Sequence, residues 1–506
     1  MTELKGQSIL VLGLGSSGLA MARWCTRCGA DVTVADTRLN PPQLEVLGQE
    51  VPGARFIHSN FDDSLLDAAP FAAVFKSPGL TPSSVELLTR STKKRFARIK
   101  GELDLFWQAL NDLKVMQTYE PSVLAITGTN GKTTVTSLTG QLIERANKSV
   151  AVAGNIGPSL LDTLASRLDS GELPSVWVIE LSSFQLDSVE GFEPTAAAVL
   201  NISQDHLDWH GSLPAYAAAK ARVFGSKTKM LLNRDDALVM KMLPVAPDKG
   251  RAKDFKAPDF ETFGADMPQR AGDFGLEEVN GMVWLVRAMQ AEKLQRKRNE
   301  PAEEIYIQRL LPADALRIRG RHNAVNALAA LSLAMSAGCS MAPILFGLRE
   351  YRGEPHRVEP VALINGVEFF DDSKGTNVGA TVAALQGLGS ERKLVVILGG
   401  DGKSQDFSPL VVPVQRFARA VVLIGRDAPL IKAVLAVTGV PLIEAATMEL
   451  AVAASSQLAH PGDAVLMSPA CASFDMFENY THRAAVFRDA VTAINAAAEP
   501  AMVGQP

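Results

Sequence analysis

The segment at residues 126–134, which reads I-T-G-T-N-G-K-T-T, constrains the fold of this chain more than any other stretch. An apolar run at 123–126 predicts a short buried strand before it, and apolar residues at helical spacing over 134–146 predict a helix after it. A strand, a glycine-bearing turn and Lys-Thr at the start of a helix are typical of a phosphate-binding loop, because backbone N–H groups and the helix N-terminus point at the phosphates. The segment therefore predicts an α/β domain that binds ATP.

Within this loop, Lys132 would neutralise the outer phosphates and the Thr133 hydroxyl would hold a magnesium ion. The spacing departs from the common G-x-x-x-x-G-K-[ST] pattern, because the position five before Gly131 is Ile126. The alternative is a glycine-rich helix entry that carries a surface lysine. We favour the phosphate loop because of the strand and helix around it.

The chain of 506 residues is too long for one hydrophobic core, and its length alone predicts about three domains. The hydrophobic fraction of 47% and the charged fraction of 21% are ordinary for a soluble globular protein. No apolar run approaches the roughly 18 residues that a membrane span needs, and the first residues lack the pattern of a signal peptide. We therefore expect a cytoplasmic protein with no membrane partner.

The charge and the cysteines narrow the possible partners. A net charge of −5 argues against nucleic-acid binding, and we interpret the basic run at 93–98 as a solvated local face. Four cysteines in a chain of this length do not form a disulfide scaffold. Cys25 and Cys28 form a C-x-x-C pattern inside a predicted helix without a second pair, so a zinc or redox site is the less favoured alternative.

The N-terminal part predicts a nucleotide-binding domain. A strand at 8–12 leads into G-L-G-S-S-G and a helix to about residue 28, and a second strand at 31–35 ends at Asp36. A G-x-G-x-x-G with an acid 18 positions after its last glycine is the dinucleotide-binding fingerprint, which on its own would favour a dehydrogenase. The same geometry binds any nucleotide diphosphate, so NAD is only one option. A further strand at 71–76 ends at Ser77, another ligand position at a strand's carboxyl edge.

Polar residues also follow the predicted strands of the central part. An apolar strand at 175–179 ends in Glu180, which is a usual way to place a second magnesium ligand beside a phosphate loop, although a charge at a helix N-terminus is the alternative. A strand at 196–201 precedes His206. Lys220 lies on an alanine-rich helix, where periodicity alone predicts an exposed lysine.

The regular pattern weakens from 244 to 311, where the charged stretch at 291–304 is typical of a surface insertion, and a long apolar helix then runs to 337. A third part begins near residue 353. Its predicted strands lie at 367–370, 393–398, 420–424, 441–443 and 464–467. Helical stretches alternate with these strands, which indicates a parallel sheet whose carboxyl edge binds ligands.

These motifs together resemble those of the Mur ligases, which are ATP-dependent amide-forming enzymes that build the peptide of bacterial cell-wall precursors. The resemblance rests on the order G-T-N-G-K-T-T, G-N-I-G, E-L-S-S-F-Q, D-H-L-D, R-H-N-x-x-N-A, P-H-R, D-D-S-K-G-T-N, L-G-G-D-G-K and S-P-A-C-A-S-F-D. The last three motifs look most like those of the members that add D-glutamate to UDP-N-acetylmuramoyl-L-alanine. Two departures, S-S-G in the first glycine loop and the 291–304 insertion, concern the uridine contacts and leave the catalytic motifs intact.

The resemblance implies an α/β fold of three domains, each with a mostly parallel sheet. Residues 1–111 would form a Rossmann-like domain that binds UDP, and residues 112–352 a central P-loop domain that binds ATP. Residues 353–506 would form a Rossmann-like domain that binds the amino acid and part of ATP. The resemblance also implies a monomer in the cytoplasm.

The resemblance further implies roles for individual residues. ATP would be bound by Gly128, Thr129, Asn130, Gly131, Lys132, Thr133, Thr134, Asn323, Asn326, His356, Arg357 and Asp372. The UDP substrate would be bound by Ser16, Ser17, Asp36, Thr37, Arg38, Ser77 and Asn155. D-glutamate would be bound by Thr376, Lys403, Ser473, Phe474 and Tyr480. The catalytic residues would be Lys132, Glu180, His206 and Lys220. Two Mg²⁺ ions would be held by Thr133, Glu180, His206 and Lys220, with Lys220 carbamylated by carbon dioxide.

The implied chemistry suits these residue types. ATP would convert the alanyl carboxylate into an acyl phosphate, from which the amine of D-glutamate displaces phosphate. Several anions must meet, so lysine, magnesium and helix N-termini are needed to offset their repulsion. Three alternatives remain: a sister ligase or folate polyglutamate ligase with another amino acid, a nicotinamide dehydrogenase, and a nucleotide-binding switch without catalysis.

Overall fold

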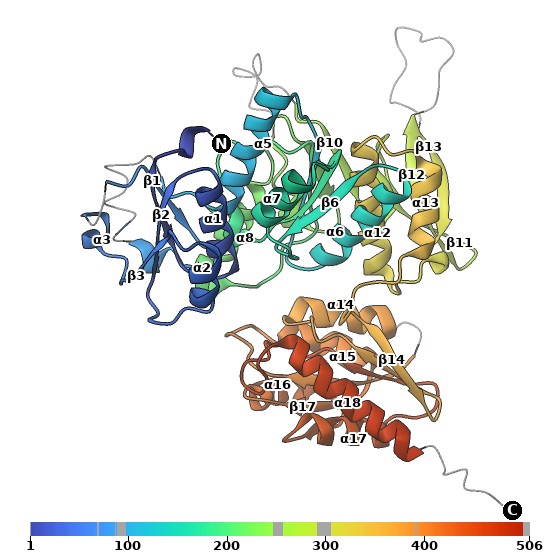
Figure 1. The fold of residues 1–506 in the computed structure, drawn as a ribbon. Coiled ribbons are helices and arrows are strands. Elements are labelled where there is room, and N and C mark those ends of the chain that lie inside the picture. The colour runs from blue at the N-terminus through green and yellow to red at the C-terminus, as the bar shows by residue number, and fades with distance from the viewer. Residues whose placement is uncertain are drawn as a thin grey trace, which may run out of the picture.

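The computed structural model describes residues 2–67, 70–86, 88, 98–245, 257–290, 305–389 and 392–498. It shows an α/β protein of three domains, each with a mostly parallel sheet, which confirms the predicted fold class (Figure 1). Within the described residues, no helix is long and apolar enough to cross a membrane. The charged stretch at 291–304 and residues 93–97 of the basic run lie outside the described residues.

A four-stranded parallel sheet in the order β3-β2-β1-β4 forms the N-terminal domain. Its elements are β1 (Ser8–Leu12), α1 (Ser16–Arg27), β2 (Asp31–Asp36), α2 (Leu44–Glu50), β3 (Arg55–His58), α3 (Asp63–Asp67) and β4 (Ala73–Lys76). The sequence predicted β1, β2 and β4, which are the buried strands. It missed β3 at the sheet edge, where two of the four residues are exposed and two are half-buried. Because β1 is central, the glycine loop after it lies between the carboxyl ends of its two neighbours.

A six-stranded parallel sheet in the order β10-β9-β8-β5-β7-β6 forms the central domain. Its first half contains β5 (Ser122–Thr127), α6 (Lys132–Arg145), β6 (Val150–Gly154), α7 (Leu160–Ser170), β7 (Val176–Glu180), α8 (Ser183–Leu186) and β8 (Ala196–Val199). Its second half contains α9 (Leu207–His210), α10 (Leu213–Ala221), β9 (Lys229–Asn233), α11 (Ala237–Met240), β10 (Phe260–Phe263), α12 (Arg321–Ser336) and α13 (Met341–Glu350). The phosphate loop follows β5 in the middle of this sheet.

A separate antiparallel sheet, in the order β11-β12-β13, packs on α12 of the central domain. Its strands are β11 (Phe274–Val279), β12 (Met282–Gln290) and β13 (Ile305–Pro312). The sequence predicted no regular structure here. These strands pair with each other and bury only part of their side chains, so their apolar pattern is weaker than that of the parallel strands.

Helix α5 (Glu102–Gln117) connects the first two domains. It packs against α1 and α7, and the three helices share one hydrophobic core with the N-terminal and central sheets. Residue 111, at which the sequence places the first domain boundary, lies inside this helix. The first two domains therefore meet through a continuous apolar core.

The C-terminal domain contains a six-stranded sheet in the order β14-β15-β19-β16-β17-β18, in which only β14 is antiparallel to its neighbour. Its first elements are β14 (Glu359–Ile364), β15 (Val367–Asp371), α14 (Val378–Gly389), β16 (Leu394–Gly399), α15 (Val411–Phe417) and β17 (Ala418–Ile424). Its last elements are α16 (Ala428–Leu435), β18 (Leu442–Glu444), α17 (Met448–Leu458), β19 (Ala464–Met467) and α18 (Tyr480–Ala498). Figure 1 shows this domain, in orange and red, with α14 on the side that faces the central domain, where it contacts α12.

Candidate active site

The phosphate loop has the backbone geometry that its sequence predicts. Gly131 caps α6 in the left-handed region at φ +84°, and a Cβ there would come within 2.8 Å of the Asn326 side chain, so only glycine fits. The Lys132 ammonium donates to the carbonyls of Gly128 at 3.0 Å and Thr129 at 2.8 Å. Burial lowers the pKa of Lys132, and the nearby Glu180 opposes this shift. The loop therefore holds a cation at the N-terminus of a helix.

Asn201, which the sequence analysis did not assign to the site, fixes the shape of this loop. Its backbone carbonyl accepts from the Thr129 N–H at 2.9 Å, and its side-chain oxygen accepts from the Asn130 N–H at 2.8 Å. Its side-chain amide donates to the Asn130 carbonyl at 3.0 Å. Asn201 follows β8, which pairs with β5, so the adjacent strand end stabilises the loop.

Glu180 lies where the sequence places it, at the carboxyl end of β7 and opposite Ile126 of β5. The side chain is 1% exposed, and the Asn155 amide donates to its Oε1 at 2.7 Å. Within the described residues, the buried Oε2 has no hydrogen-bond partner. A buried carboxylate oxygen without a donor beside a phosphate loop suits a hard divalent cation, so the residues fit the expected magnesium ion.

Thr133 connects the phosphate loop to the C-terminal domain. Its hydroxyl accepts from the Arg357 guanidinium at 2.9 Å. Next to it, the Asn377 amide donates to the Asn130 side-chain oxygen at 3.0 Å. Arg357 and Asn377 belong to the C-terminal domain, so that domain lies directly on the loop. Arg357 was predicted from sequence, whereas Asn377 was missed, although it ends the D-D-S-K-G-T-N motif.

Lys220 is buried, so the exposed position that periodicity predicts for it is wrong. The side chain is 1% exposed, and its ammonium donates to the Thr127 hydroxyl at 3.3 Å and lies 4.7 Å from the Tyr216 ring. The reason lies in packing, because α10 packs against α8 and α9 and places Lys220 at the end of β5, where Thr127 lies. Burial lowers the pKa of Lys220 well below its ordinary value, and the Lys132 charge lowers it further.

His206 lies beside Asp205 at the start of α9. Its backbone adopts the left-handed conformation at φ +53°, and its Nε2 lies 3.5 Å from the Asp205 carboxylate. Burial lowers the pKa of His206, Asp205 opposes the shift, and the charge of Lys403 adds to the lowering. Lys403 of the C-terminal domain is therefore close enough to act electrostatically on His206. The charge of Asp205 also raises the pKa values of Lys132 and Lys220 against the effect of burial, and the sequence analysis gave Asp205 no role.

A cavity of about 120 Å³ lies between the central and C-terminal domains. The residues predicted to bind ATP that line it are Asn130, Gly131, Thr134, Asn323, Asn326, Arg357 and Asp372. His356 is not among the described lining residues, and its Nδ1 instead lies 2.7 Å from the Asp371 carboxylate. Arg488 donates to Asp371 as well, so this carboxylate is paired within the C-terminal domain.

We expect Asp372→Asn to raise the free energy of unfolding of the ligand-free protein near neutral pH by roughly 1 kcal/mol or more. Burial raises the pKa of Asp372 to about 7, although the Ser468 hydroxyl that donates to it at 2.6 Å opposes the shift. Between its ordinary pKa of 3.8 and about 7 the folded state binds the proton more tightly than the unfolded state, so stability falls as the pH rises through this window.

Urea unfolding at about pH 5 and about pH 8 measures this effect. The wild-type protein should lose stability between the two values, and the asparagine variant should lose less, because its side chain stays neutral. Ser468 can still donate to the asparagine side-chain oxygen, so the packing is kept. The same pH dependence in both proteins would contradict the expectation.

The residues predicted to bind D-glutamate surround the carboxyl edge of the C-terminal sheet, but they are unevenly exposed. Ser473 is buried, Thr376 and Tyr480 are half-buried, and Lys403 and Phe474 are exposed. Among the described residues, no hydrogen bond joins these five side chains to each other. A missed residue, Lys374 of the same D-D-S-K motif, lies with its ammonium 4.0 Å from the Tyr480 ring. The edge thus presents two lysines and several hydroxyls.

The residues predicted to bind the UDP substrate lie at the carboxyl edge of the N-terminal sheet. Asp36 accepts from the Leu14 N–H at 2.7 Å and from the guanidinium of Arg38 at 2.8 and 2.9 Å. Burial opposes these bonds, yet they hold the pKa of Asp36 at about 2. The Thr37 carbonyl contacts His58 at 3.1 Å. Asp36 therefore stabilises the glycine loop through its hydrogen bond to the Leu14 N–H.

The two predicted serines of this loop and Ser77 lie at the same edge. Ser16 is the first residue of α1, and Ser17 hydrogen-bonds to the buried Glu102. The Ser77 hydroxyl lies 3.8 Å from where a Cβ of Gly15 would be. Asn155, on the central domain, is the one member of the predicted set that bonds to Glu180.

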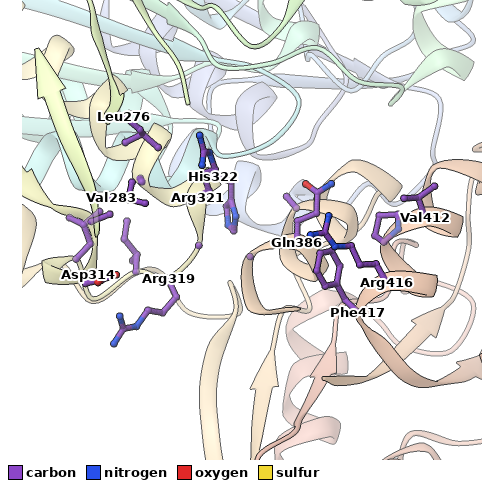
Figure 2. A pocket seen from close by; sticks show the side chains of 18 residues that line it. Leu276, Val283, Asp314, Arg319, Arg321, His322, Gln386, Val412, Arg416 and Phe417 are labelled. Atoms are coloured by element: carbon purple, nitrogen blue, oxygen red, sulfur yellow. The ribbon is translucent and has the colours of Figure 1, made fainter. Parts of the chain in front are cut away.

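A larger cavity of about 550 Å³ opens beside the smaller one. Figure 2 shows Arg319, Arg321 and His322 of the central domain on one side and Arg416 and Phe417 of the C-terminal domain on the other. Among the described side chains that line it, none belongs to the predicted site. Its polar side chains are three exposed arginines together with Asp314, His322 and Gln386, and the candidate site is therefore the smaller cavity and the phosphate loop.

The four cysteines are free, and Cys28 alone of them is partly exposed. Among the described residues, the one group with the spacing of a metal site is His356, Glu359 and Asp371. Arg488 pairs with both carboxylates of that group, so it is a hydrogen-bonded cluster. Within the part of the chain that the structure describes, Cys25 and Cys28 belong to no group of this kind.

Three known protein-family domains match this chain and together cover most of it. The description "Mur ligase MurD-like, N-terminal domain" matches residues 7–95, "Mur ligase middle domain" matches 126–334, and "Mur ligase, glutamate ligase domain" matches 356–471. A protein of Albidiferax ferrireducens named UDP-N-acetylmuramoylalanine--D-glutamate ligase is 64% identical over 504 residues, which cover 100% of this chain and 99% of that protein. A protein of the same name from Burkholderia cenocepacia is 56% identical and covers 96% of this chain and 97% of its own length.

Solved structures share the fold at low identity. The MurF ligase of Thermotoga maritima in complex with ADP has a TM-score of 0.56 at 15% identity, covering 97% of this chain and 96% of that one. The UDP-N-acetylmuramate-alanine ligase MurC of Thermotoga maritima has a TM-score of 0.55 at 20% identity, covering 96% of this chain and 100% of that one. These similarities concern the arrangement of the domains.

Proposed function

This chain belongs to the Mur ligase family, and from that premise we propose that it joins D-glutamate to UDP-N-acetylmuramoyl-L-alanine with ATP. The reaction passes through an acyl phosphate, gives ADP and phosphate, and belongs to peptidoglycan precursor synthesis in the cytoplasm. The observation that carries the proposal is the 64% identity to a D-glutamate ligase over the whole length of both chains. The match of residues 356–471 to a glutamate ligase domain supports the same amino acid.

Each domain has one task in this proposal. Residues 1–111 bind UDP, 112–352 bind ATP, and 353–506 bind D-glutamate and part of ATP. The groups that the reaction needs come from one chain, since Lys132, Glu180 and Arg357 already lie around one loop. A second copy is not needed to complete the site, which supports a monomer.

Positive groups of the protein first offset the negative charge of the phosphates. A carboxylate is a poor acylating agent because its leaving group would be oxide, so the alanyl carboxylate is phosphorylated by ATP. Lys132 and the N-terminus of α6 offset the negative charge of the phosphoryl group during transfer. Arg357 bonds to Thr133 from the C-terminal domain and so brings a second cation to the same phosphates.

Magnesium, when bound, supplies a positive charge that lowers the repulsion between the phosphates and the carboxylate. We propose two ions, held by Thr133, Glu180, His206 and Lys220. The unpaired Oε2 of Glu180 supports the first position. For the second, Lys220 would act as a carbamate, because a buried lysine with a lowered pKa is partly neutral and a neutral amine can add to carbon dioxide.

D-glutamate should be the amino acid that supports the fastest phosphate release from ATP, with L-glutamate, L-alanine and diaminopimelate poor. A substrate with two carboxylates suits a site with a cation at Lys403 and hydroxyls at Thr376, Ser473 and Tyr480. Lys403→Ala should raise the KM for D-glutamate about tenfold or more, the scale of one charge-assisted hydrogen bond, and leave the KM for ATP near its original value.

The assay is phosphate release with UDP-N-acetylmuramoyl-L-alanine and each amino acid in turn. Lys432→Ala is the matched control, because Lys432 is an exposed lysine of the same domain that pairs with Glu444 at 2.6 Å. Faster release with another amino acid would point to a sister ligase. No release with any amino acid would point to a nucleotide-binding switch, and reduction of a nicotinamide would point to a dehydrogenase.

A further inference from the structure

A buried lysine lies where the N-terminal and central domains meet. Lys76 is the last residue of β4, and its side chain is 7% exposed. Its ammonium has one hydrogen bond, a long one of 3.4 Å to the Leu80 carbonyl. Among the described residues, no carboxylate lies within salt-bridge distance of it. Burial lowers the pKa of Lys76, and the charge of Asp187 opposes this shift from farther away. The ammonium instead lies 5.4 Å from the ring of Trp209 in the central domain.

Trp209 is likewise incompletely bonded. Its side chain is 9% exposed, and within the described residues its indole N–H has no hydrogen-bond partner. Its ring lies 4.9 Å from that of Phe184, which in turn lies 4.7 Å from that of His206. A row of neighbouring rings, those of Trp209 and Phe184, therefore lies between Lys76 and His206, which is one of the predicted catalytic residues.

These two side chains carry a cost that the ligand-free protein only partly offsets. A buried cation without a salt-bridge partner and a buried N–H without an acceptor are both unfavourable, and they occur here side by side. A bound anion with oxygen acceptors would satisfy both at once. The residue after Lys76 is Ser77, whose hydroxyl lies beside Gly15 of the glycine loop, so the pair is at the edge that is expected to bind UDP.

We propose that Lys76 and Trp209 form a binding site for an anionic arm of the UDP substrate, which is its diphosphate or its alanyl carboxylate. The proposal rests on the proposed function, because it takes UDP-N-acetylmuramoyl-L-alanine as the ligand. Lys76 binds a negatively charged oxygen of this arm, and the indole N–H of Trp209 donates to a second oxygen. The two residues come from different domains, so substrate binding joins those domains at this point.

Lys76→Met tests the proposal, because methionine keeps a flexible apolar side chain against Trp209 and removes the charge. The KM for the UDP substrate should rise about tenfold or more, while the KM values for ATP and D-glutamate stay within about twofold. The thermal midpoint of the ligand-free variant should rise, because an unpaired buried cation has been removed. A purely structural lysine would give the opposite result, a lower midpoint with all KM values unchanged or raised alike.

Lys114→Met is the matched control for loss of one charge. Lys114 is an exposed lysine on α5 that pairs with Glu120 at 3.2 Å, so this variant should keep all three KM values. Trp209→Phe supplies the direct readout of binding. The tryptophan fluorescence of the wild type should change on addition of the UDP substrate, and most of that change should be lost in Trp209→Phe.

Two anions of this substrate can occupy the site, its diphosphate and its alanyl carboxylate, and titration with UDP alone distinguishes them. Weaker binding of UDP by Lys76→Met assigns the contact to the diphosphate. Unchanged binding of UDP with weaker binding of the full substrate assigns it to the carboxylate. Equal binding of both ligands by the variant and the wild type overturns the proposal. These titrations need no turnover, so they stay informative even if D-glutamate supports no phosphate release.

Discussion

Lys132→Ala should lower the rate of phosphate release from ATP at least about a thousandfold, because it removes the cation that faces the transferred phosphoryl group. The Lys132 ammonium bonds to the carbonyls of Gly128 and Thr129 and is buried with a lowered pKa. The structure around it does not depend on this charge, since Asn201 holds the same loop through three hydrogen bonds. The variant should therefore fold and lose catalysis.

The measurement is phosphate release with UDP-N-acetylmuramoyl-L-alanine and D-glutamate, together with thermal unfolding of each protein. Lys241→Ala, which removes an exposed lysine after α11, should keep the wild-type rate. The thermal midpoint of Lys132→Ala should not fall, because removal of a buried cation relieves its desolvation. Equal turnover in the wild type and the folded variant would show that this loop does not bind the ATP that reacts.

Lys220→Ala should be nearly inactive and should regain part of its activity in the presence of acetate. The reason is the proposed carbamate: an alanine leaves space beside Thr127 and Tyr216, and a small carboxylate can take the place of the anionic group. Lys220→Arg should be inactive and should not be rescued, because a guanidinium keeps its charge and cannot add to carbon dioxide. Acetate should have no effect on the wild type.

Two further observations bear on Lys220. The matched control is chloride at the same ionic strength, which should not rescue Lys220→Ala. Carbon-13 labelled bicarbonate should give a carbamate signal in the wild-type protein that is absent from Lys220→Arg. Electron density for an unmodified Lys220 in an enzyme that contains magnesium and nucleotide would contradict the carbamate.

Lys220 is buried although helical periodicity predicts that it is exposed, so the local sequence pattern was not enough to place it. Periodicity reports which side of a helix is apolar, and α10 is mostly alanine, so it has little contrast between its faces. Burial of Lys220 depends on how closely α10 approaches β5 in the sheet of the central domain, and this distance is set by contacts between segments far apart in the chain. The antiparallel sheet β11–β13 was missed for a different reason, because its strands pair with their neighbours in the chain but bury few of their side chains, so their apolar pattern is weak.

The sequence by itself determined the α/β class, most of the parallel strands and the residues at their carboxyl ends. Buried parallel strands are continuous apolar runs, and glycine loops have few possible conformations, so both leave a clear pattern in the chain. The sequence also predicted the places of Lys132 at the start of α6 and of Glu180 at the end of β7, while their roles stay predictions. These are local features, and the neighbouring residues are enough to produce them.

Only the tertiary structure decided which of these strand ends meet. It brought Arg357 to Thr133 across two domains, left one oxygen of Glu180 without a donor, and set Lys76 against Trp209. The physical reason is that burial and unpaired polar groups arise from contacts between segments far apart in the chain, where sequence spacing carries no information on distance.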